Sequence, residues 1–284
     1  MKEQFYFNQI QGKELLVASL GIHNSDWKEI STKEFSQNKQ VVHDIMIKNH
    51  YDVIPVKNKS GSFAHYVTTS SWGDYSLSNI EMKSIKFAED GIYYLTHISD
   101  AIRLMVENKR NFYFLTNHTS VVGLLSIANL NNKYFYYWLY QNLVDLEQGL
   151  GKMLSSQLDT QQICNRIEEL SSQDNDLGKW FKDTSNRYKE DQKKNSDTAI
   201  TEYLYFGQLI ELFHQFDLHK ILGYKNGDGF KKHTSYLNKI RNTVAHPTRS
   251  LIQDHSSLIE LWNGIVKMDE LSKSLVRESK ENMD

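Results

Sequence analysis

The N-terminal half of the chain carries the same succession of apolar patterns twice. Residues 41–50 have helical spacing, Y-D-V-I-P-V and F-A-H-Y-V-T-T are strand-like runs, and K-N-K-S-G-S between them has the composition of a turn. Residues 98–130 follow the same order, with a helical stripe that Ser99 or Asp100 could cap and then N-F-Y-F-L-T and S-V-V-G-L-L-S-I. The segments begin about 55–60 residues apart, so we predict an internal repeat.

After Leu130 the apolar positions follow helical spacing. The first stripe consists of Phe135, Trp138, Leu139, Leu143, Leu146 and Leu150. Residues 155–199 are polar and charged, which fits either an exposed helix or a partly mobile connection, and we place a domain boundary within them. A long amphipathic helix is expected over 201–216, followed by a loop at G-Y-K-N-G-D-G and two more helices.

These patterns predict an α+β protein. Residues 1–132 should form a pair of α/β units, 133–199 a helical connector and 200–284 an all-α bundle. A length of 284 residues with 39% hydrophobic positions is enough for two or three domains with real cores.

Charge and cysteine content restrict the location. The net charge of -2 argues against a general polyanion binder, although a local basic face can be hidden in a neutral total. Cys164 is the sole cysteine, so no intrachain disulfide can form, and a reducing cytoplasm is the simplest location. We expect no membrane association, because the first residues lack an apolar signal-peptide core and the apolar run 134–140 is too short to span a bilayer.

The most informative chemistry lies in L-N-K-I-R-N-T-V-A-H-P, residues 237–247. Arg241 can pair bidentately with phosphate oxygens, Asn242 adds hydrogen-bonding capacity, and His246 can exchange a proton near neutral pH. Because Pro247 disfavours helical dihedrals at the residue before it, the helix should break at His246, and the break could turn the imidazole toward Arg241. From residue 217 to 249, seven Lys and Arg stand against two Asp, a local excess of five positive charges.

The R-N-T-V-A-H segment and the helices around it, about the last 85 residues, resemble the HEPN superfamily of metal-independent endoribonucleases. The resemblance implies a homodimer whose paired motifs cut RNA by attack of the ribose 2′-hydroxyl. In it His246 is the general base or acid, Arg241 stabilises charge on the phosphate, and Asn242 orients groups. The alternative is that Arg241 and His246 only place favourable cations at a helix C-terminus. A competing pair, Arg249 and His255, lacks the asparagine and the helical frame.

The repeated units resemble a pair of CBS motifs, over roughly residues 15–130, which implies an adenine-nucleotide ligand. In that family a Thr or Ser near a strand end and an acidic residue three positions on contact phosphate and ribose. Thr68 and Ser126 match the hydroxyl, whereas Ser71 and Asn129 stand where the acid is expected and depart from the family's ribose contact. The alternative is a dimerisation platform in which Thr68 and Ser126 satisfy backbone groups.

No other constellation carries comparable chemistry. The histidines lack metal-ligand spacing, so we expect no metal site and no cofactor for catalysis. The sequence thus predicts a cytoplasmic, homodimeric endoribonuclease regulated by a nucleotide-like ligand, by analogy a defence effector or toxin. The alternative is a non-catalytic, nucleotide-responsive regulator or RNA-binding adaptor.

Overall fold

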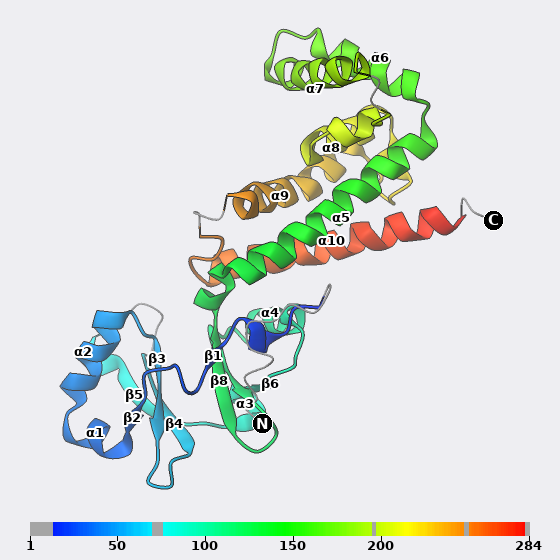
Figure 1. The fold of residues 1–284 in the computed structure, drawn as a ribbon. Helices are drawn as coiled ribbons and strands as arrows, with labels where there is room; N and C mark the ends of the chain where they lie inside the picture. Colours follow the sequence, from blue (N-terminus) through cyan, green and yellow to red (C-terminus); the bar gives the residue numbers. More distant parts are fainter. Residues whose placement is uncertain (1–13, 70–75, 195–196, 247–249, 282–284) are drawn as a thin grey trace. The chain divides into compact units, whose positions relative to one another are not determined.

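The computed structural model describes residues 14–69, 76–194, 197–246 and 250–281, and the chain divides into two compact units (Figure 1). The first unit comprises Met1–Tyr136 and Ser250–Trp262, and the second comprises Tyr137–Arg249 and Asn263–Asp284. Both sheets belong to the first unit, and the second is helical. The molecule therefore combines an α/β half and an all-α half.

The first sheet has the strand order β2-β3-β4-β5. Its strands are β2 (Ile30–Ser31), β3 (Val53–Lys57), β4 (Phe63–Thr69) and β5 (Ile80–Ser84). Strands β2 and β3 are parallel and are joined by α1 (Thr32–Gln37) and α2 (Lys39–Asn49), whereas β3-β4 and β4-β5 are antiparallel. Val42 and Met46 of α2 are buried with Ile54, Val56 and Val67 of the sheet, so the apolar face of α2 covers one side of it.

The second sheet repeats this arrangement with the order β1-β8-β7-β6. Its strands are β1 (Ile22–His23), β6 (Gly91–Tyr93), β7 (Phe112–Thr116) and β8 (Val121–Ser126). Here β6 and β7 are parallel and joined through α4 (Ile98–Glu107), and β7 and β8 form an antiparallel hairpin. Both hairpins shift register at the same place, between Val56 and Lys57 and between Leu115 and Thr116. The predicted internal repeat is confirmed.

An aromatic cluster with residues from both hairpins fills part of the core of the first unit. The Trp27 ring meets Phe63 edge-on at 4.7 Å between centroids, and Tyr66 meets Phe114 at 5.4 Å. Edge-to-face pairs of this kind add about 0.5–1.5 kcal/mol to the burial of the rings. The two repeats therefore share one core.

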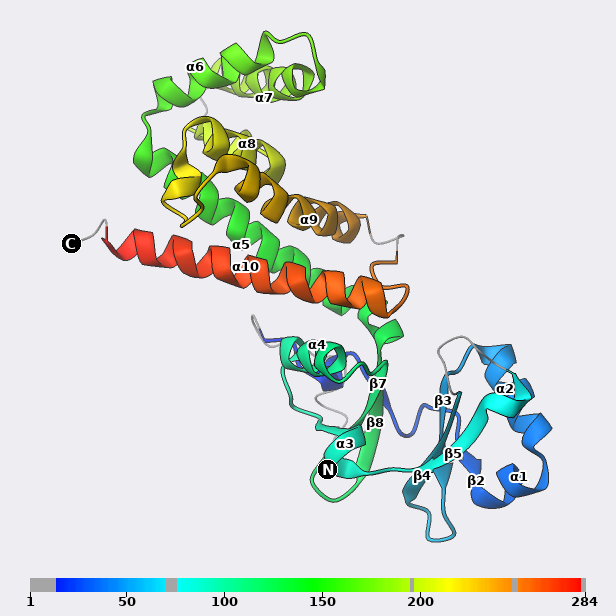
Figure 2. The ribbon, with the colours of Figure 1, turned by 180° about the vertical axis from the view of Figure 1, so that it is seen from behind.

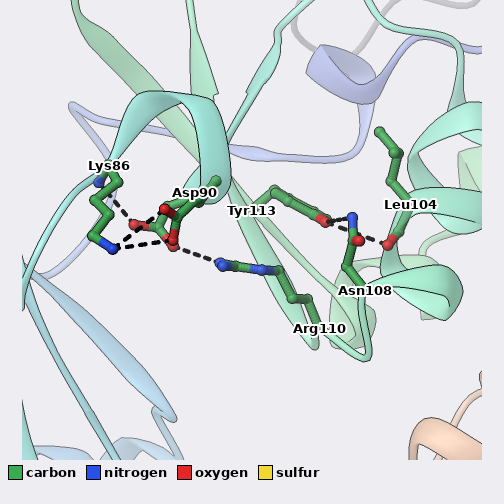
Figure 3. A network of polar contacts seen from close by, with 7 residues as sticks. Lys86, Asp90, Leu104, Asn108, Arg110 and Tyr113 are labelled. Carbon is green, nitrogen blue, oxygen red and sulfur yellow. Dashed lines mark hydrogen bonds and ion pairs between the residues drawn. The ribbon is translucent and has the colours of Figure 1, made fainter.

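A buried carboxylate fixes the segment between the two hairpins (Figure 3). Asp90, at the end of the short helix α3 (Phe87–Asp90), is almost fully buried, accepts the backbone N–H of Lys86 at 2.8 Å and pairs with Arg110. The Arg110 guanidinium also lies over the Tyr113 ring, and the Tyr113 hydroxyl accepts from Asn108 and donates to Leu104 O. These contacts tie α3 and the end of α4 to β7.

The second unit is built from helices (Figure 2). They are α5 (Lys133–Gln157), α6 (Thr160–Ser171), α7 (Asp176–Gln192), α8 (Phe206–Gln215), α9 (Gly227–Ala245) and α10 (His255–Glu281), of which α5 and α10 begin in the first unit. The stripe predicted for α5 is buried from Phe135 to Leu150. Figures 1 and 2 show α5 and α10 side by side, and a Cβ at Gly149 would come within 2.9 Å of Leu275.

Most of residues 155–199 is helix, α6 and α7, in agreement with the helical alternative, and α6 also buries a narrow stripe of Ile163, Ile167 and Leu170. Two other sequence-based expectations need correction. The long helix expected over 201–216 is a 3₁₀ turn (Ile200–Tyr203) followed by the ten-residue α8. The glycine loop ends at Asn226, whose side chain accepts from Gly229 N–H and caps α9, so two of its glycines lie in the helix.

The cap of α4 also differs from expectation. The helix begins at Ile98, and the ring Nδ1 of His97, rather than Ser99 or Asp100, accepts the first free backbone N–H, that of Ser99. Burial lowers the pKa of His97, which favours the neutral ring that this contact requires.

Candidate functional site

The Arg-Asn-His segment lies at the C-terminal end of α9. Leu237, Ile240 and Val244 are buried and fix one face of this helix against the unit. Arg241 and Asn242 follow one another in the last turns, so neither belongs to that apolar stripe. The buried residues on either side of them, Ile240 and Val244, thus leave both polar side chains off the packed stripe.

Arg241 is held by an acid from a distant part of the chain. Its Nε lies 3.4 Å from Oε1 of Glu147 on α5, and the guanidinium lies 5.7 Å from the centre of the Tyr205 ring. The contact with Glu147 is an ion pair rather than a hydrogen bond, since Nε has no hydrogen-bond partner among the described residues. The side chain of Arg241 keeps 23% of its surface exposed, so it is oriented but still accessible.

Glu147 is a largely buried acid that contacts a backbone N–H as well as Arg241. Its carboxylate accepts the backbone N–H of Phe206 at 2.9 Å, which holds the start of α8. Burial raises the pKa of Glu147, and the Arg241 guanidinium and the Phe206 N–H act in the opposite direction. Perturbed carboxylates of this kind gather at functional sites, although structural ion pairs also produce them.

His246 stands at the break that Pro247 predicts. The helix ends at Ala245, and His246 adopts non-helical dihedrals of φ -124° and ψ 75° while its N–H donates to Thr243 O at 3.1 Å. His246 and Asn242 are both exposed. Pro247 and Arg249 lie outside the described residues, so the competing pair of Arg249 and His255 is described only through His255, whose ring contacts Asn111 Oδ1. The approach of His246 to Arg241 stays a prediction.

The net positive charge around α9 is smaller than the count over residues 217–249 indicates. Lys231 pairs with Glu211 of α8 at 2.6 Å, and Arg241 pairs with Glu147. Neither acid lies in the 217–249 segment, and including both lowers the excess from five to three positive charges. The bare electrostatic attraction for a phosphate backbone is therefore weaker than expected.

A cavity of about 720 Å³ opens beside Glu147 in the helical unit. It is lined by α5, the segment from Ala199 to Leu204 and Leu209 of α8, and it includes the polar side chains Lys152 and Glu202. Its size is that of a small-molecule site. Glu147 therefore faces both this cavity and Arg241.

The hydroxyl and amide candidates of the first unit already have partners within the chain. Thr68 is buried at the end of β4, and its hydroxyl donates to Asp52 O at 3.0 Å. Ser126 closes β8, and its N–H and hydroxyl both donate to Asn129 Oδ1, at 2.7 and 3.0 Å. Asn129 thus caps a short 3₁₀ helix (Ile127–Asn131), a role that explains an amide at this position without a ligand.

The sequence missed the residues that contact Arg241. These are Glu147 of α5 and Tyr205 at the start of α8, whose ring also contacts Arg187 of α7, and no local spacing connects them with α9. The only available signal was the position of Glu147 inside the apolar stripe of α5, next to Leu146, where an acid requires a partner.

The described part of the chain offers neither a cluster of metal-ligand side chains nor a membrane-spanning helix. There, no three His, Cys, Asp or Glu side chains come together as a metal site. No helix of those residues is long and apolar enough to cross a bilayer.

Comparison with known proteins gives similarity only at the level of solved structures. No family model and no curated protein matches the sequence. The CBS domains of a transcriptional regulator from Streptococcus pneumoniae match at 16% identity and a TM-score of 0.32, over 41% of this chain and 96% of that one. An uncharacterized conserved protein from Pyrococcus horikoshii matches at 14% identity and a TM-score of 0.25, over 32% of this chain and 74% of that one.

Proposed function

We propose that the helical unit is a metal-independent endoribonuclease, with Arg241, Asn242 and His246 as one half of a site that a second copy of the chain completes. The observation that carries the proposal is the end of α9, where an accessible guanidinium held by Glu147 precedes an exposed imidazole at the helix break. A permanent cation and an imidazole that can accept and donate a proton are what phosphodiester transfer without metal requires.

In the proposed reaction His246 removes the proton of the ribose 2′-hydroxyl. The 2′-oxygen then attacks the adjacent phosphorus, the bond from phosphorus to the 5′-oxygen breaks, and the imidazole of the second copy donates a proton to that oxygen. Arg241 stabilises the charge that builds on the phosphate oxygens, and Asn242 orients the phosphate. The products are a 2′,3′-cyclic phosphate and a 5′-hydroxyl.

The proposed regulator is the first unit, which binds an adenine-nucleotide-type ligand near Thr68, Ser126 and Asn129. Support comes from its two matched β-α-β-β repeats, which place equivalent strand ends in both halves. A ligand that binds one arrangement of the dimer better than another shifts the population toward it. A sensor fused to a ribonuclease in this way would suit a cytoplasmic defence effector or toxin.

The decisive experiment compares wild type, Arg241→Ala and His246→Ala on end-labelled RNA in EDTA. We expect wild type to leave 2′,3′-cyclic phosphate ends and both variants to lose at least about a hundredfold in rate, as for removal of a general base. Arg166→Ala is the matched control, because this guanidinium of α6 contacts Glu169 and Gln215 elsewhere in the unit. Cleavage that persists in His246→Ala would contradict the mechanism.

The ligand is tested separately by thermal unfolding with a panel of adenine nucleotides. A nucleotide that binds the native state raises the apparent Tm by an amount that grows with the logarithm of its concentration relative to Kd. Thr68→Val should abolish the shift, and Asn129→Asp, which restores the expected acid, should enlarge it. An unchanged Tm in every nucleotide would remove the adenine-nucleotide assignment.

One observation favours a second candidate, a non-catalytic regulator or RNA-binding adaptor. Arg241 already has a structural partner in Glu147, and Thr68 and Ser126 satisfy groups of their own chain. In that case wild type binds RNA or nucleotide without cutting, and Arg241→Ala lowers the Tm because it leaves the half-buried Glu147 unpaired.

A further inference from the structure

Two arginines from different helices converge on one exposed aromatic ring. The ring of Tyr205, at the start of α8, is 39% exposed, and the guanidinium carbons of Arg187 and Arg241 lie 5.0 and 5.7 Å from its centre. Arg187 comes from α7 and Arg241 from α9. A half-exposed ring with a cation from each neighbouring helix offers a stacking surface and charge for phosphate oxygens in one place.

Arg187 and Arg241 each pair with one carboxylate through Nε, and each has further guanidinium N–H groups that can donate to another acceptor. Arg187 pairs through Nε with the exposed Asp183, and its Nη2 donates weakly to Thr184 and Tyr203. Within the described part of the chain, Arg241 contacts a carboxylate only through Nε. The carboxylates reduce long-range attraction, so a ligand of this cluster is held by stacking and close hydrogen bonds more than by net charge.

A second aromatic side chain lines a groove of about 200 Å³ on the same three helices. Trp180 of α7 packs its indole edge over Gly207 of α8, where a Cβ would come within 2.5 Å of the ring. From α9 the groove is lined by Lys231, Ser235 and Asn238. Its volume is that of roughly seven waters, enough for one planar ring beside an amide that can hydrogen-bond its edge.

The groove, the Tyr205 cluster and His246 follow one another along α9. Residues 231, 235, 238 and 242 recur at intervals of three and four, so they share one face of the helix, and Arg241 adjoins it. A rise of about 1.5 Å per residue puts Asn238 and the helix end about 10 Å apart. An extended ligand can therefore touch the groove and reach the exposed His246.

We propose that this face of α7, α8 and α9 binds single-stranded RNA, with one base stacked on Tyr205, another on Trp180 and a phosphate held by Arg187 and Arg241. The proposal deepens the proposed function by naming its substrate as unpaired RNA, and it rests on that function only for the cleavage at His246. Paired bases are stacked inside a duplex and cannot reach flat aromatic surfaces, so the face discriminates against double-stranded RNA.

The experiment measures binding of a fluorescent RNA oligonucleotide by anisotropy in EDTA, with all proteins carrying His246→Ala to prevent cutting. We expect Tyr205→Leu and Trp180→Leu each to weaken single-strand binding roughly 5- to 100-fold, the stacking contribution of one base. Tyr205→Phe should retain affinity because it keeps the ring. Tyr137→Leu, which removes a tyrosine of the same unit that is 58% exposed, should bind like the parent.

The outcomes separate the two proposals. Binding that depends on Tyr205 without any cutting by the chain with His246 intact would support the RNA face and remove the nuclease. Cutting by that chain with unchanged binding in Tyr205→Leu would keep the nuclease and overturn the RNA face, as would equal affinity for a duplex. Far-UV circular dichroism must show each variant folded, and Trp180→Leu decides the matter if Tyr205→Leu unfolds.

Discussion

Glu147 joins three features of the helical unit through one side chain. It pairs with Arg241, accepts the Phe206 N–H at the start of α8 and lines the 720 Å³ cavity. The pKa of Glu147 is raised because the loss of hydration on burial destabilises the charged form more than Arg241 and the Phe206 N–H stabilise it. The orientation of Arg241 therefore depends on the protonation of a residue on another helix.

The raised pKa predicts a pH dependence of stability. Because the folded state holds the Glu147 proton more tightly than the unfolded chain, stability falls as pH rises through the range just above about 4.5. Glu147→Gln removes this contribution, so its free energy of unfolding should fall less over that range than that of wild type. Urea unfolding at a series of pH values measures the difference. Parallel profiles for the two proteins would refute the assignment.

At the scale of residues, the sequence predicted the part of the candidate site that lies on α9 and missed the residues that other helices contribute. Arg241, Asn242 and His246 are neighbours in the chain, and Pro247 marks the break, so local spacing sufficed to predict the helix end at Ala245. Glu147 and Tyr205 are brought to Arg241 by helix packing, which no single stretch of sequence encodes. The excess of positive charge was overestimated for the same reason.

At the scale of elements, the contact between α9 and α10 requires the glycine at position 264, whereas the surroundings of Gly151 in α5 have room for a larger residue. Gly264 of α10 faces α9, and a Cβ there would come within 2.6 Å of Ile240 Cδ1 and 2.9–3.0 Å of the Tyr236 ring. A Cβ at Gly151 of α5 would meet Thr201 at 3.7 Å, an ordinary contact. Two helical glycines of one unit thus stand in opposite environments.

We predict that Gly264→Ala destabilises the protein by about 1–3 kcal/mol through overpacking. Gly151→Ala should stabilise it by about 0.5–1 kcal/mol, because alanine restricts the unfolded chain and favours the helix. Chemical denaturation of both variants checks the signs. Equal effects would mean that α9 and α10 are not packed as closely as the contacts at Gly264 require.

Apolar periodicity predicted the elements that bury a wide face and was less decisive where the face is narrow. The stripes of α5, α9 and α10 were visible, as were both β-hairpins. In α6 the buried stripe is three residues in a highly polar context, so the sequence allowed either an exposed helix or a mobile connection. The shortness of α8 follows from a 3₁₀ turn, which shares the local apolar spacing of an α-helix.

At the scale of the whole molecule, the first unit is discontinuous in sequence. Its second piece, Ser250–Trp262, is attached through Asn131, whose amide donates to Ile252 O at 2.7 Å and whose Oδ1 accepts the N–H groups of Leu251 and Ile252. In α10, Leu258 and Leu261 are buried in the first unit and Ile265 and Met268 in the second. Periodicity predicted the apolar stripe of α10, but it could not show which residues of the stripe belong to which unit.

Asn131→Ala should therefore lower the stability of the first unit by about 2–3 kcal/mol, since it leaves the N–H and the carbonyl of Ile252 without their partner, whereas Leu251 N–H keeps the Tyr136 hydroxyl. Asn142→Ala, which removes a single bond to Trp138 O within α5, should cost less than about 1 kcal/mol. Thermal unfolding compares them. If both variants melt alike, Asn131 does not hold the second piece.

Because residues 250–262 belong to the first unit, the two units do not correspond to two separate stretches of a gene. A stop codon anywhere between residues 137 and 249 removes part of both units, including the partner of Asn131. Nonsense and frameshift alleles in that range should therefore damage the first unit as well as the helical unit. A missense allele there, such as a change of Arg241 or His246, can alter the helical unit and leave the first unit intact.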